Sequence, residues 1–519
     1  MKLISHGAAR EVTGSCHELQ IGAHRILLDC GLFQGSRKAS AEKNSTFVFD
    51  PSKDIDAVIL THAHMDHVGR IPVLHKRGYR GPIYCTYATK DLAPVMLQDG
   101  GYLQEKDEEF FRKHCADTMM ACEGPLYTQE DAANCAELFV GKNYSEWFEV
   151  LPGIKAKFLD AGHVLGAAMV VLEIDQLRHV RHAERSEAPQ SGAERSRSTS
   201  QGSGDSASML MRDASISLPF DAAQGRSTQH DVPVLRIGFS GDLGRATLPI
   251  IRDPEPMPPV DMLICESTYG NRLHEDVLTA KHRLAEVIQR TVARGGKVLI
   301  PAFSLERTQE ILYDLHLLWD EKNIPEVPII IDSPLASRVT EIFMKHPECY
   351  DRAMYEQFLS RAHNPFQFSL VRYTTSVEES KKLNTYSGPM IIMAGSGMCE
   401  GGRIRHHLTN YIEDPKSTVL AVGYMAENTL GRRIIEKSIS TVRIFDQEYR
   451  KRAETVYINA YSGHADMRDL DSYITAIQGV KKLFLVHGEE QGMLALMERM
   501  KKSMTADIVM PERGVTYSL

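Results

Sequence analysis

Short apolar runs that end in a histidine or an aspartate recur along this chain, and they limit the folds that it can adopt. The run "IDAVIL" (55–60) leads directly into "THAHMDHVG" (61–69), which holds three histidines and an aspartate within six residues. Short apolar runs between turns predict strands. Packing at a strand end gives no reason for such a polar cluster, whereas zinc binds imidazole and carboxylate groups together. The pattern predicts a fold whose strand ends assemble a metal site.

The spacing HxHxDH is the strongest ligand signal in the sequence. His62 and His64 lie two residues apart in a loop, so both imidazoles can reach one ion. Asp66 and His67 follow at once and can reach a second ion close by. A lone histidine is more often structural, but this is a cluster, and we expect it to bind metal.

A two-ion site needs further ligands, including one that bridges the ions. Three more side chains follow predicted strands: His163 in "DAGHVLGAA", Asp242 in "FSGDLG" and His487 in "LFLVHGEE". Each alone could be a capping or hydrogen-bonded surface residue, but together they converge on C-terminal strand ends. Asp29 in "ILLDCG" also ends a strand. It is either a turn aspartate or, as we favour, a carboxylate that holds a ligand imidazole.

Length and composition exclude several classes of protein. The 519 residues argue for two or more domains, and no apolar stretch approaches the length of a membrane span. The first residues lack the pattern of a secretory signal, and nine cysteines without a CxxC pair are typical of reduced thiols, so we expect a cytoplasmic protein. The formal charge of -8 does not indicate a nucleic-acid binder, so a polyanion would have to meet a local basic patch or the metals.

Residues 176–232 differ in amino-acid composition from the rest of the chain. They hold eleven serines, one aromatic residue and no net charge. Such a segment cannot bury enough apolar area to offset the entropy of ordering it. We therefore predict a disordered insertion in the hairpin loop between "MVVLEI" and "VLRIGFSGD"; the alternative is a tethered interaction arm.

A strand-then-helix rhythm runs from about residue 260 to residue 436, through segments such as "GGKVLIPAFSLERTQEILYDLHLLW". This rhythm predicts a mostly parallel sheet with flanking helices. Two further predicted strands, in "ETVYINAYSGHAD" and "KKLFLVHGEE", lead into His464 and His487 and return the chain to the first domain.

The motifs resemble those of a known family. "THAHMDH" resembles the signature of the metallo-β-lactamase superfamily, and "GAAREVTGSCH", "ESTYG", "PAFSLERTQE", "GSGMCEGGRIRHHL", "SGHAD" and "VHGE" are similar to motifs of its β-CASP branch. That branch includes RNA nucleases similar to the cleavage and polyadenylation specificity factor nuclease. The resemblance implies an α/β fold: an αββα sandwich, over residues 1–260 and 446–519, with an inserted β-CASP domain over 261–445.

The resemblance also implies roles for individual residues. Glu266 matches the branch's acidic motif A, His464 motif B and His487 motif C, where a histidine is typical of RNA-directed members and a valine of DNA-directed ones. The family's metal ligands map onto seven residues, which are His62, His64 and His163 for one zinc ion, Asp66, His67 and His487 for the other, and Asp242 as the bridge.

The implied activity is that of a ribonuclease that uses two zinc ions and a bridging hydroxide to attack phosphorus in line. Asp66 and Asp242 act in catalysis by holding the ions. His464 is the candidate general acid for the leaving 3′ oxygen, and Glu266 would orient it and raise its pKa. A capping role for His464 and a surface position for Glu266 are the alternatives.

Contacts to RNA phosphates are expected from hydroxyl and guanidinium groups near glycine-rich loops. The candidates are Ser304, Arg307, Ser396, Arg403 and Ser462. A salt bridge within the domain is the equal alternative for Arg307. His406 and His407 are interpreted as a pair on a helix surface.

Three other functions stay open at this point. A small-molecule hydrolase of the same superfamily would share the core motif, but not the long cap or "SGHAD". A scaffold subunit would have lost ligands, and all seven positions are filled. A flavodiiron-type oxidoreductase would carry a glutamate ligand and a flavodoxin-like segment.

The expected substrate is single-stranded RNA. The family makes a homodimer plausible, and the sequence does not separate endonuclease from exonuclease.

Overall fold

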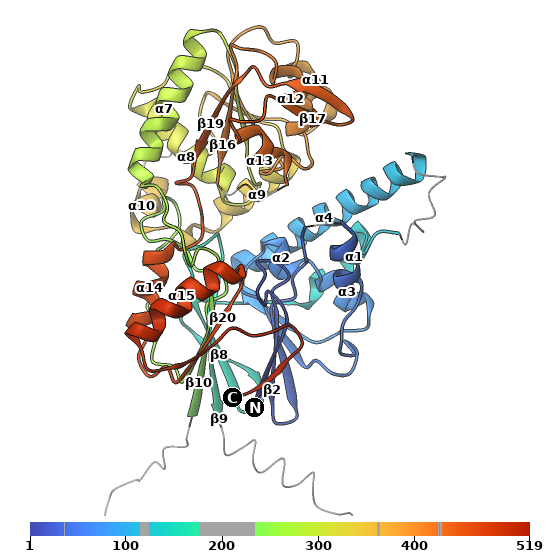
Figure 1. Cartoon of the computed structure of the whole chain (residues 1–519), viewed down its shortest axis with the longest axis vertical. Helices are drawn as coiled ribbons and strands as arrows, with labels where there is room; N and C mark the ends of the chain where they lie inside the picture. The colour runs from blue at the N-terminus through green and yellow to red at the C-terminus, as the bar shows by residue number, and fades with distance from the viewer. Residues whose placement is uncertain (36, 115–123, 176–233, 361–363, 424, 426–427) are drawn as a thin grey trace, which may run out of the picture.

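The computed structural model describes residues 1–35, 37–114, 124–175, 234–360, 364–423, 425 and 428–519. The predicted disordered insertion, 176–232, lies outside the described residues. Figure 1 shows two parts: a core that contains both chain termini, and a cap above it.

The core is built on two seven-stranded sheets. The first has the order β22 (Thr516–Ser518), β1 (Lys2–Gly7), β2 (Cys16–Ile21), β3 (His24–Leu28), β4 (Ala57–Ile59), β5 (Ile83–Thr86) and β6 (Phe139–Lys142). The second has the order β21 (Asp507–Val509), β20 (Lys482–Val486), β11 (Met262–Glu266), β10 (Val234–Phe239), β9 (Ala168–Asp175), β8 (Ile154–Asp160) and β7 (Trp147–Leu151).

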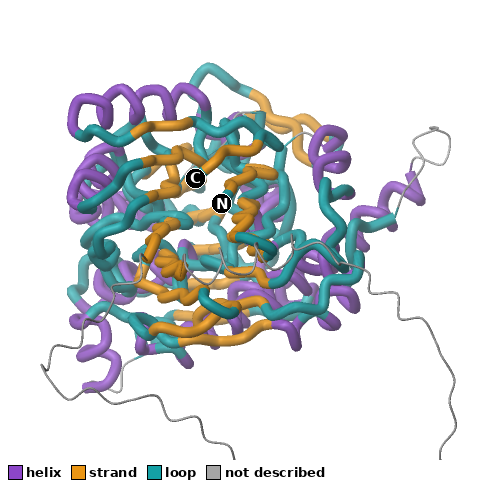
Figure 2. Tube along the Cα trace, turned by 90° about the horizontal axis from the view of Figure 1, so that it is seen from below, coloured by secondary structure: helices purple, strands orange, loops and turns teal. Residues whose placement is uncertain are grey.

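Apolar side chains from both sheets form one buried cluster between them, which includes Leu19 and Leu28 of the first sheet and Phe158, Val170 and Phe239 of the second. Helices lie outside the sheets, and Figure 2 shows the strands between helices on either side. The helical elements of the core are α1 (Arg37–Ser45), α2 (Met65–Val68), α3 (Ile71–Lys76), α4 (Tyr87–His114), α5 (Gln129–Asn134), η1 (Ala136–Leu138), α14 (Met467–Ala476) and α15 (Glu490–Ser503). This arrangement confirms the αββα sandwich expected from the sequence.

The cap contains a six-stranded sheet whose neighbouring strands are all parallel. Its order is β14 (Val371–Tyr373), β13 (Ile329–Ile331), β15 (Ile391–Ala394), β12 (Val298–Pro301), β16 (Thr418–Val422) and β19 (Glu454–Ile458). The remaining cap elements are α7 (Val277–Ala293), α8 (Arg307–Asp320), α9 (Pro334–Lys345), η2 (Pro347–Cys349), α10 (Arg352–Ser360), α11 (Val377–Leu383), α12 (Ile404–Tyr411), α13 (Leu430–Ile435), β17 (Thr441–Ile444) and β18 (Gln447–Arg450).

Local sequence explains where the cap helices begin. The carboxylate of Asp276 accepts the Thr279 N–H and caps α7. The hydroxyl of Ser333 accepts the Ala336 N–H and caps α9, and Pro334 occupies the first helical position, where no N–H is needed. All four residues of β12 and all four residues of β15 are buried, and so are the residues of the neighbouring strands β13 and β16. Such burial is expected for strands with helices on both faces of the sheet.

The sheets divide the chain differently from the boundary expected at residues 445 and 446. Strand β19 pairs with β16 and completes the cap sheet, so the chain leaves the cap after Ile458. The segment before His464 is therefore not a core strand. The alternation of apolar residues in "ETVYI" identifies a strand, but it does not tell which sheet the strand joins.

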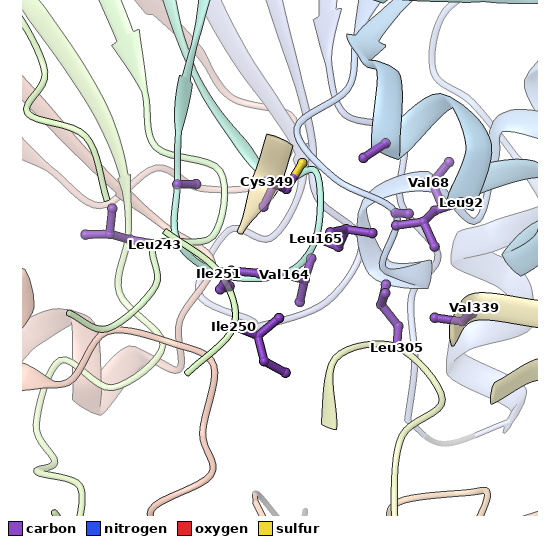
Figure 3. Packing of buried hydrophobic residues seen from close by; sticks show 14 of the residues in the cluster. Val68, Leu92, Val164, Leu165, Leu243, Ile250, Ile251, Leu305, Val339 and Cys349 are labelled. Atoms are coloured by element: carbon purple, nitrogen blue, oxygen red, sulfur yellow. The ribbon is translucent and has the colours of Figure 1, made fainter. Parts of the chain in front are cut away.

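One apolar cluster extends from the core into the cap. Figure 3 shows part of it, with Val164 and Leu165 of the core near Leu305 and Val339 of the cap. This packing holds the cap over the carboxyl ends of the core strands. Within the described residues, no helix has the length and hydropathy that a membrane span requires.

Candidate metal centre

The expected ligands lie where strands of both core sheets end. His62 follows β4 and Asp29 follows β3 in the first sheet, whereas Asp242 follows β10 and His487 follows β20 in the second. His163 lies in the loop between β8 and β9. Because these strand ends meet at one edge of the sandwich, residues far apart in the sequence converge there, as the sequence predicts.

Three imidazoles and a carboxylate form a first group. The Nδ1 atom of His64 lies 3.1 Å from Nε2 of His62 and 3.2 Å from Nε2 of His163. The Oδ2 atom of Asp242 lies 3.6 and 3.5 Å from the same two Nε2 atoms. Tetrahedral zinc with Zn–N bonds of about 2.0–2.1 Å would separate neighbouring nitrogens by about 3.3 Å. The four side chains therefore have the spacing of a shared cation site.

Asp66, His67 and His487 form a second group. The Nε2 atoms of His67 and His487 are 3.2 Å apart, and Oδ2 of Asp66 lies 3.5 Å from Nε2 of His487. Asp242 faces this group with its other oxygen, since Oδ1 lies 3.2 Å from Nε2 of His67. One carboxylate thus presents one oxygen to each group, which is the arrangement of a bridging ligand.

The donor set fits divalent cations. The carboxylate of Asp242 is buried, and both of its oxygens face imidazole rings. Burial, together with neighbouring imidazoles, lowers the pKa of His62 and His163 well below the ordinary value and that of His64 to about 4. Three neutral imidazoles and a buried carboxylate are the donors that a metal ion needs.

The electrostatic potential of the centre also favours a cation. Burial disfavours the charged form of His67, but the Asp242 and Asp29 carboxylates outweigh burial and raise the pKa of His67 well above its ordinary value. The negative potential that draws a proton onto His67 is one that a divalent ion would neutralise.

Asp29 holds the imidazole of His67, a candidate ligand, as one of the two interpretations of the sequence predicts. It is fully buried, and its Oδ2 atom lies 2.7 Å from Nδ1 of His67. Asp29 also accepts hydrogen bonds from the Ser15 hydroxyl and from the N–H and hydroxyl of Thr61. These bonds fix the carboxylate, which in turn leaves Nε2 of His67 as the nitrogen that faces the site.

Backbone and hydroxyl groups orient two further rings. Nδ1 of His163 lies 3.0 Å from the Gly463 carbonyl, so it donates and leaves Nε2 without a proton. Nδ1 of His487 lies 3.1 Å from the hydroxyl of Thr268. The structure therefore gives each of these rings a support on the side away from its Nε2 atom.

His464 and Glu266 lie beside the two groups. Nδ1 of His464 is 3.2 Å from Oε1 of Glu266 and 3.8 Å from Oδ2 of Asp242. Glu266 is fully buried and is not the surface carboxylate of the alternative interpretation. Its Oε1 also accepts the Leu243 N–H, and its Oε2 accepts the Thr268 N–H. Burial lowers the pKa of His464, but Glu266 and Asp242 outweigh it and raise the pKa to about 9.

The arginines expected to contact phosphates are engaged within the cap. Arg307 is buried and ion-paired with Glu310, the alternative that its sequence context left open. Nη1 of Arg403 donates to Oδ1 of Asp332 at 2.6 Å, and Nη2 donates to the Thr375 carbonyl. Their phosphate-binding role stays a prediction.

The serines expected to contact phosphates lie at loops of the cap and its return segment. The Ser304 hydroxyl lies 3.3 Å from that of Ser333, and the Ser396 hydroxyl accepts the Gly401 N–H. Ser462 is buried two residues before His464. The structure therefore brings the metal-ligand candidates together at one place and spreads the phosphate candidates over separate loops.

Asp332 has contacts that its sequence context did not predict, and His407 does not lie on the helix surface where the sequence placed it. Nε2 of His407 lies 2.6 Å from Oδ2 of Asp332, and both side chains are buried, so His407 is not on a helix surface. Asp332 also accepts hydrogen bonds from Thr374 and Ser380. Asp332 directly follows the apolar run "PIII", and a position after an apolar run is also the signal that pointed to Asp242 as a candidate ligand.

Three family models match the chain: the Beta-Casp domain over residues 308–434, the Zn-dependent metallo-hydrolase RNA specificity domain over 448–511, and the metallo-beta-lactamase superfamily over 9–105. Among curated proteins, Ribonuclease TTHA0252 of Thermus thermophilus is 36% identical over 496 residues, which cover 96% of this chain and 95% of that protein. The chain belongs to the β-CASP branch of the metallo-β-lactamase superfamily.

Other β-CASP relatives are more distant. Transcription termination factor FttA of Methanosarcina mazei is 28% identical over 97% of this chain and 69% of its own length. Cleavage and polyadenylation specificity factor 73 of Drosophila melanogaster is 26% identical over 96% of this chain and 62% of its own length. A solved structure from Enterococcus faecalis, of a protein of unknown function, covers the whole chain with a TM-score of 0.52 and 13% identity, which shows a shared fold.

Proposed function

We propose that this β-CASP protein is a ribonuclease that hydrolyses phosphodiester bonds of single-stranded RNA at a centre of two zinc ions. The observation that carries the proposal is Asp242, whose buried carboxylate faces one histidine group with each of its oxygens. The family models and the ribonuclease relative support RNA as the substrate.

The proposed ligands are divided as the sequence analysis expects. His62, His64 and His163 would hold one ion, Asp66, His67 and His487 the other, and Asp242 both. Ions bound there would supply a water molecule of lowered pKa and positive charge for the phosphate oxygens. Zinc is preferred because imidazoles dominate the ligand set.

His464 would donate the proton that the leaving 3′ oxygen needs. Glu266 occupies its Nδ1, which leaves Nε2 as the nitrogen that can donate to the substrate. The His464 ring is partly exposed, whereas Glu266 is buried and held by two backbone N–H groups. Glu266 can therefore fix the orientation of the imidazolium and stabilise its charge.

The test uses two short RNAs of one sequence, labelled at the 5′ or the 3′ end, together with a DNA of matching sequence and a duplex form of the RNA. We expect chelator-sensitive cleavage of the single-stranded RNA that returns when zinc is added. Substitution of His464 by Ala should lower kcat by about 10²- to 10⁴-fold without loss of bound metal. The exposed His282 on α7, replaced by Ala, is the matched control.

The two labels also separate endonucleolytic from exonucleolytic products. Two bound ions without RNA cleavage would overturn the proposal and favour a scaffold subunit or a small-molecule hydrolase. Equal rates for the wild type and the His464→Ala variant would exclude His464 as the general acid.

A further inference from the structure

Glu306, which directly precedes helix α8 in the cap, has a strained backbone. Its φ is 66° and its ψ is −56°, and the Arg307 N–H donates to the Leu305 carbonyl at 2.9 Å. These features define a γ-turn with positive φ, a rare and strained conformation for a residue other than glycine. A residue persists in such a turn only where its surroundings hold it there.

The side chain of Glu306 reaches from the cap into the core. It is buried, and its Oε2 atom accepts the Leu165 N–H at 2.8 Å. Leu165 lies two residues after His163, in the loop between β8 and β9. Figure 3 shows Leu165 in the apolar cluster that joins core and cap, with Leu305 of the γ-turn nearby.

Apart from the hydrogen bond with Leu165, the surroundings of the Glu306 carboxyl group are unfavourable for a polar group. Its Oε1 atom is buried without a hydrogen-bond partner. Burial and the nearby carboxyl group of Glu310 raise the pKa of Glu306 well above its ordinary value. Apolar contacts already attach the cap to the core, so a strained, buried acid adds little to that attachment. What the acid does provide is an acceptor for the main chain of the loop that carries His163.

His163 is held from two sides that both lie outside its own loop. Its ring donates from Nδ1 to the Gly463 carbonyl, in the segment that returns from the cap. Its main chain is anchored two residues later by Glu306. The first contact sets the rotation of the imidazole, and the second sets the position of the loop.

We propose that Glu306 is a positioning residue for the metal centre: from the cap, it fixes the His163 loop so that Nε2 of His163 meets the other ligands of the first group. The proposal rests on the proposed function, in which His163 is a ligand of one of two ions. It predicts that loss of the Glu306 acceptor lowers the affinity for that ion and not for the other one. The reason is that His67 and His487, which would hold the other ion, do not lie in the His163 loop.

The experiment measures zinc binding to the full chain by competition with a chromophoric chelator, RNA cleavage, and thermal unfolding. Glu306→Gln keeps an oxygen acceptor, Glu306→Ala removes it and keeps the backbone strain, and Glu306→Gly removes it and relieves the strain. Lys322, exposed with a φ of 58°, gives the matched control Lys322→Gly.

We expect the Ala and Gly variants to bind one of the two zinc ions about 10- to 100-fold more weakly and to lose kcat to a similar extent, as for other residues that orient metal ligands. KM for RNA should not change. The Gly variant should unfold at a temperature no lower than the wild type does, although its zinc binding is impaired. The Gln and Lys322→Gly variants should bind both ions like the wild type.

Three results would overturn the positioning role. The first is wild-type affinity for both ions in the Ala and Gly variants, and the second is a Gln variant as impaired as the Ala variant. The third is an equal loss of affinity for both ions, which would indicate that the substitution destabilises the fold as a whole. A wild-type chain that binds no zinc would instead refute the metal centre itself, so the two failures are distinguishable.

Discussion

At the scale of single residues, His464 would decide, in the proposed reaction, the pH range in which a proton can be given to the leaving group. Its pKa is raised to about 9 because the carboxylates of Glu266 and Asp242 outweigh the effect of burial. The imidazolium is the donor, so activity should persist below this pKa and fall as the pH rises through it.

The first prediction concerns Glu266→Gln. The variant keeps an oxygen that can accept from Nδ1 of His464 but removes the charge that stabilises the imidazolium. We expect the alkaline limb of the plot of kcat against pH to move to lower pH by about one unit or more. A nearby opposite charge typically shifts a pKa by that amount. Single-turnover rates between pH 6 and 10, at equal zinc loading, measure the limb. An unchanged limb in the variant would contradict the role of Glu266.

Residue types at strand ends predicted which imidazoles and carboxylates the fold brings together, but the partners of the arginines could not be predicted. The HxHxDH cluster has a spacing that few structural roles need, so its chemistry can be recognised without a fold. Arg307 and Arg403 each form an ion pair with a carboxylate, and a basic residue near a glycine-rich loop gives the same signal whether it binds a phosphate or a carboxylate. Only the tertiary fold brings Arg403 to Asp332, which is 71 residues away.

At the scale of elements, Asp332 connects four parts of the cap. It ends β13 and accepts from Arg403 and His407 at α12, from Thr374 after β14, and from Ser380 in α11. These donors lower the pKa of its buried carboxyl group far below the ordinary value, against the effect of burial. The stability that they provide is therefore present above the ordinary pKa of aspartate and is lost as the pH falls through the lowered one.

The second prediction is that Asp332→Asn destabilises the cap. The substitution leaves the partly buried Arg403 guanidinium without its counter-charge, and breaking such a pair costs about 3–5 kcal/mol. Urea unfolding followed by circular dichroism measures the loss. The exposed Arg443–Asp446 pair provides the control, since Asp446→Asn should leave the unfolding midpoint unchanged. Similar midpoints for both variants would show that the Asp332 contacts add little.

The third prediction concerns strands β9 and β10, which border the segment 176–233. Asp175 and Val234 are directly paired in the antiparallel ladder, so the strand ends already lie opposite each other. A two-residue Asn-Gly turn fits such a pair. Replacing 176–233 by Asn-Gly should change the unfolding temperature by no more than about 2 °C and the cleavage rate by no more than about twofold, as expected for a tolerated loop change. Loss of folding would show that the segment contributes to the sandwich.

The sequence predicted the parallel cap sheet because strand-like runs alternate with helical segments from about residue 260 to residue 436. Runs such as "VLIP" and "PIII" are apolar throughout, as expected for strands covered on both faces. It failed at β19, where an ordinary strand follows the hairpin β17–β18 and joins the cap rather than the core. Pairing partners of isolated strands depend on long-range contacts that periodicity does not encode.

At the scale of the whole molecule, the candidate metal centre lies where both core sheets and the cap meet. Its candidate ligands follow strands of both sheets, His464 follows the return from the cap, and Glu306 reaches in from the residue before α8. The individual strand ends could be found in the sequence, whereas the contact of α8 with the His163 loop could not, because nothing in the local pattern of "SLERTQE" indicates a partner 141 residues away.

The fourth prediction follows from this placement. A ligand that binds only the folded chain stabilises it by about 4 kcal/mol at a free concentration of 1,000 times Kd. In a chain of this length, each kcal/mol raises the unfolding temperature by roughly 1 °C, so each zinc ion should add roughly 4 °C.

Asp242→Ala removes a carboxylate that faces both groups, so the unfolding temperature of this variant should respond little to zinc. His282→Ala should respond like the wild type. Because zinc competes with the proton that Asp242 and Asp29 hold on His67, the rise should shrink as the pH is lowered. Scanning calorimetry with and without zinc, at pH 7.5 and pH 5.5, measures the effect. An equal rise in the Asp242→Ala variant would place the stabilising ions elsewhere in the molecule.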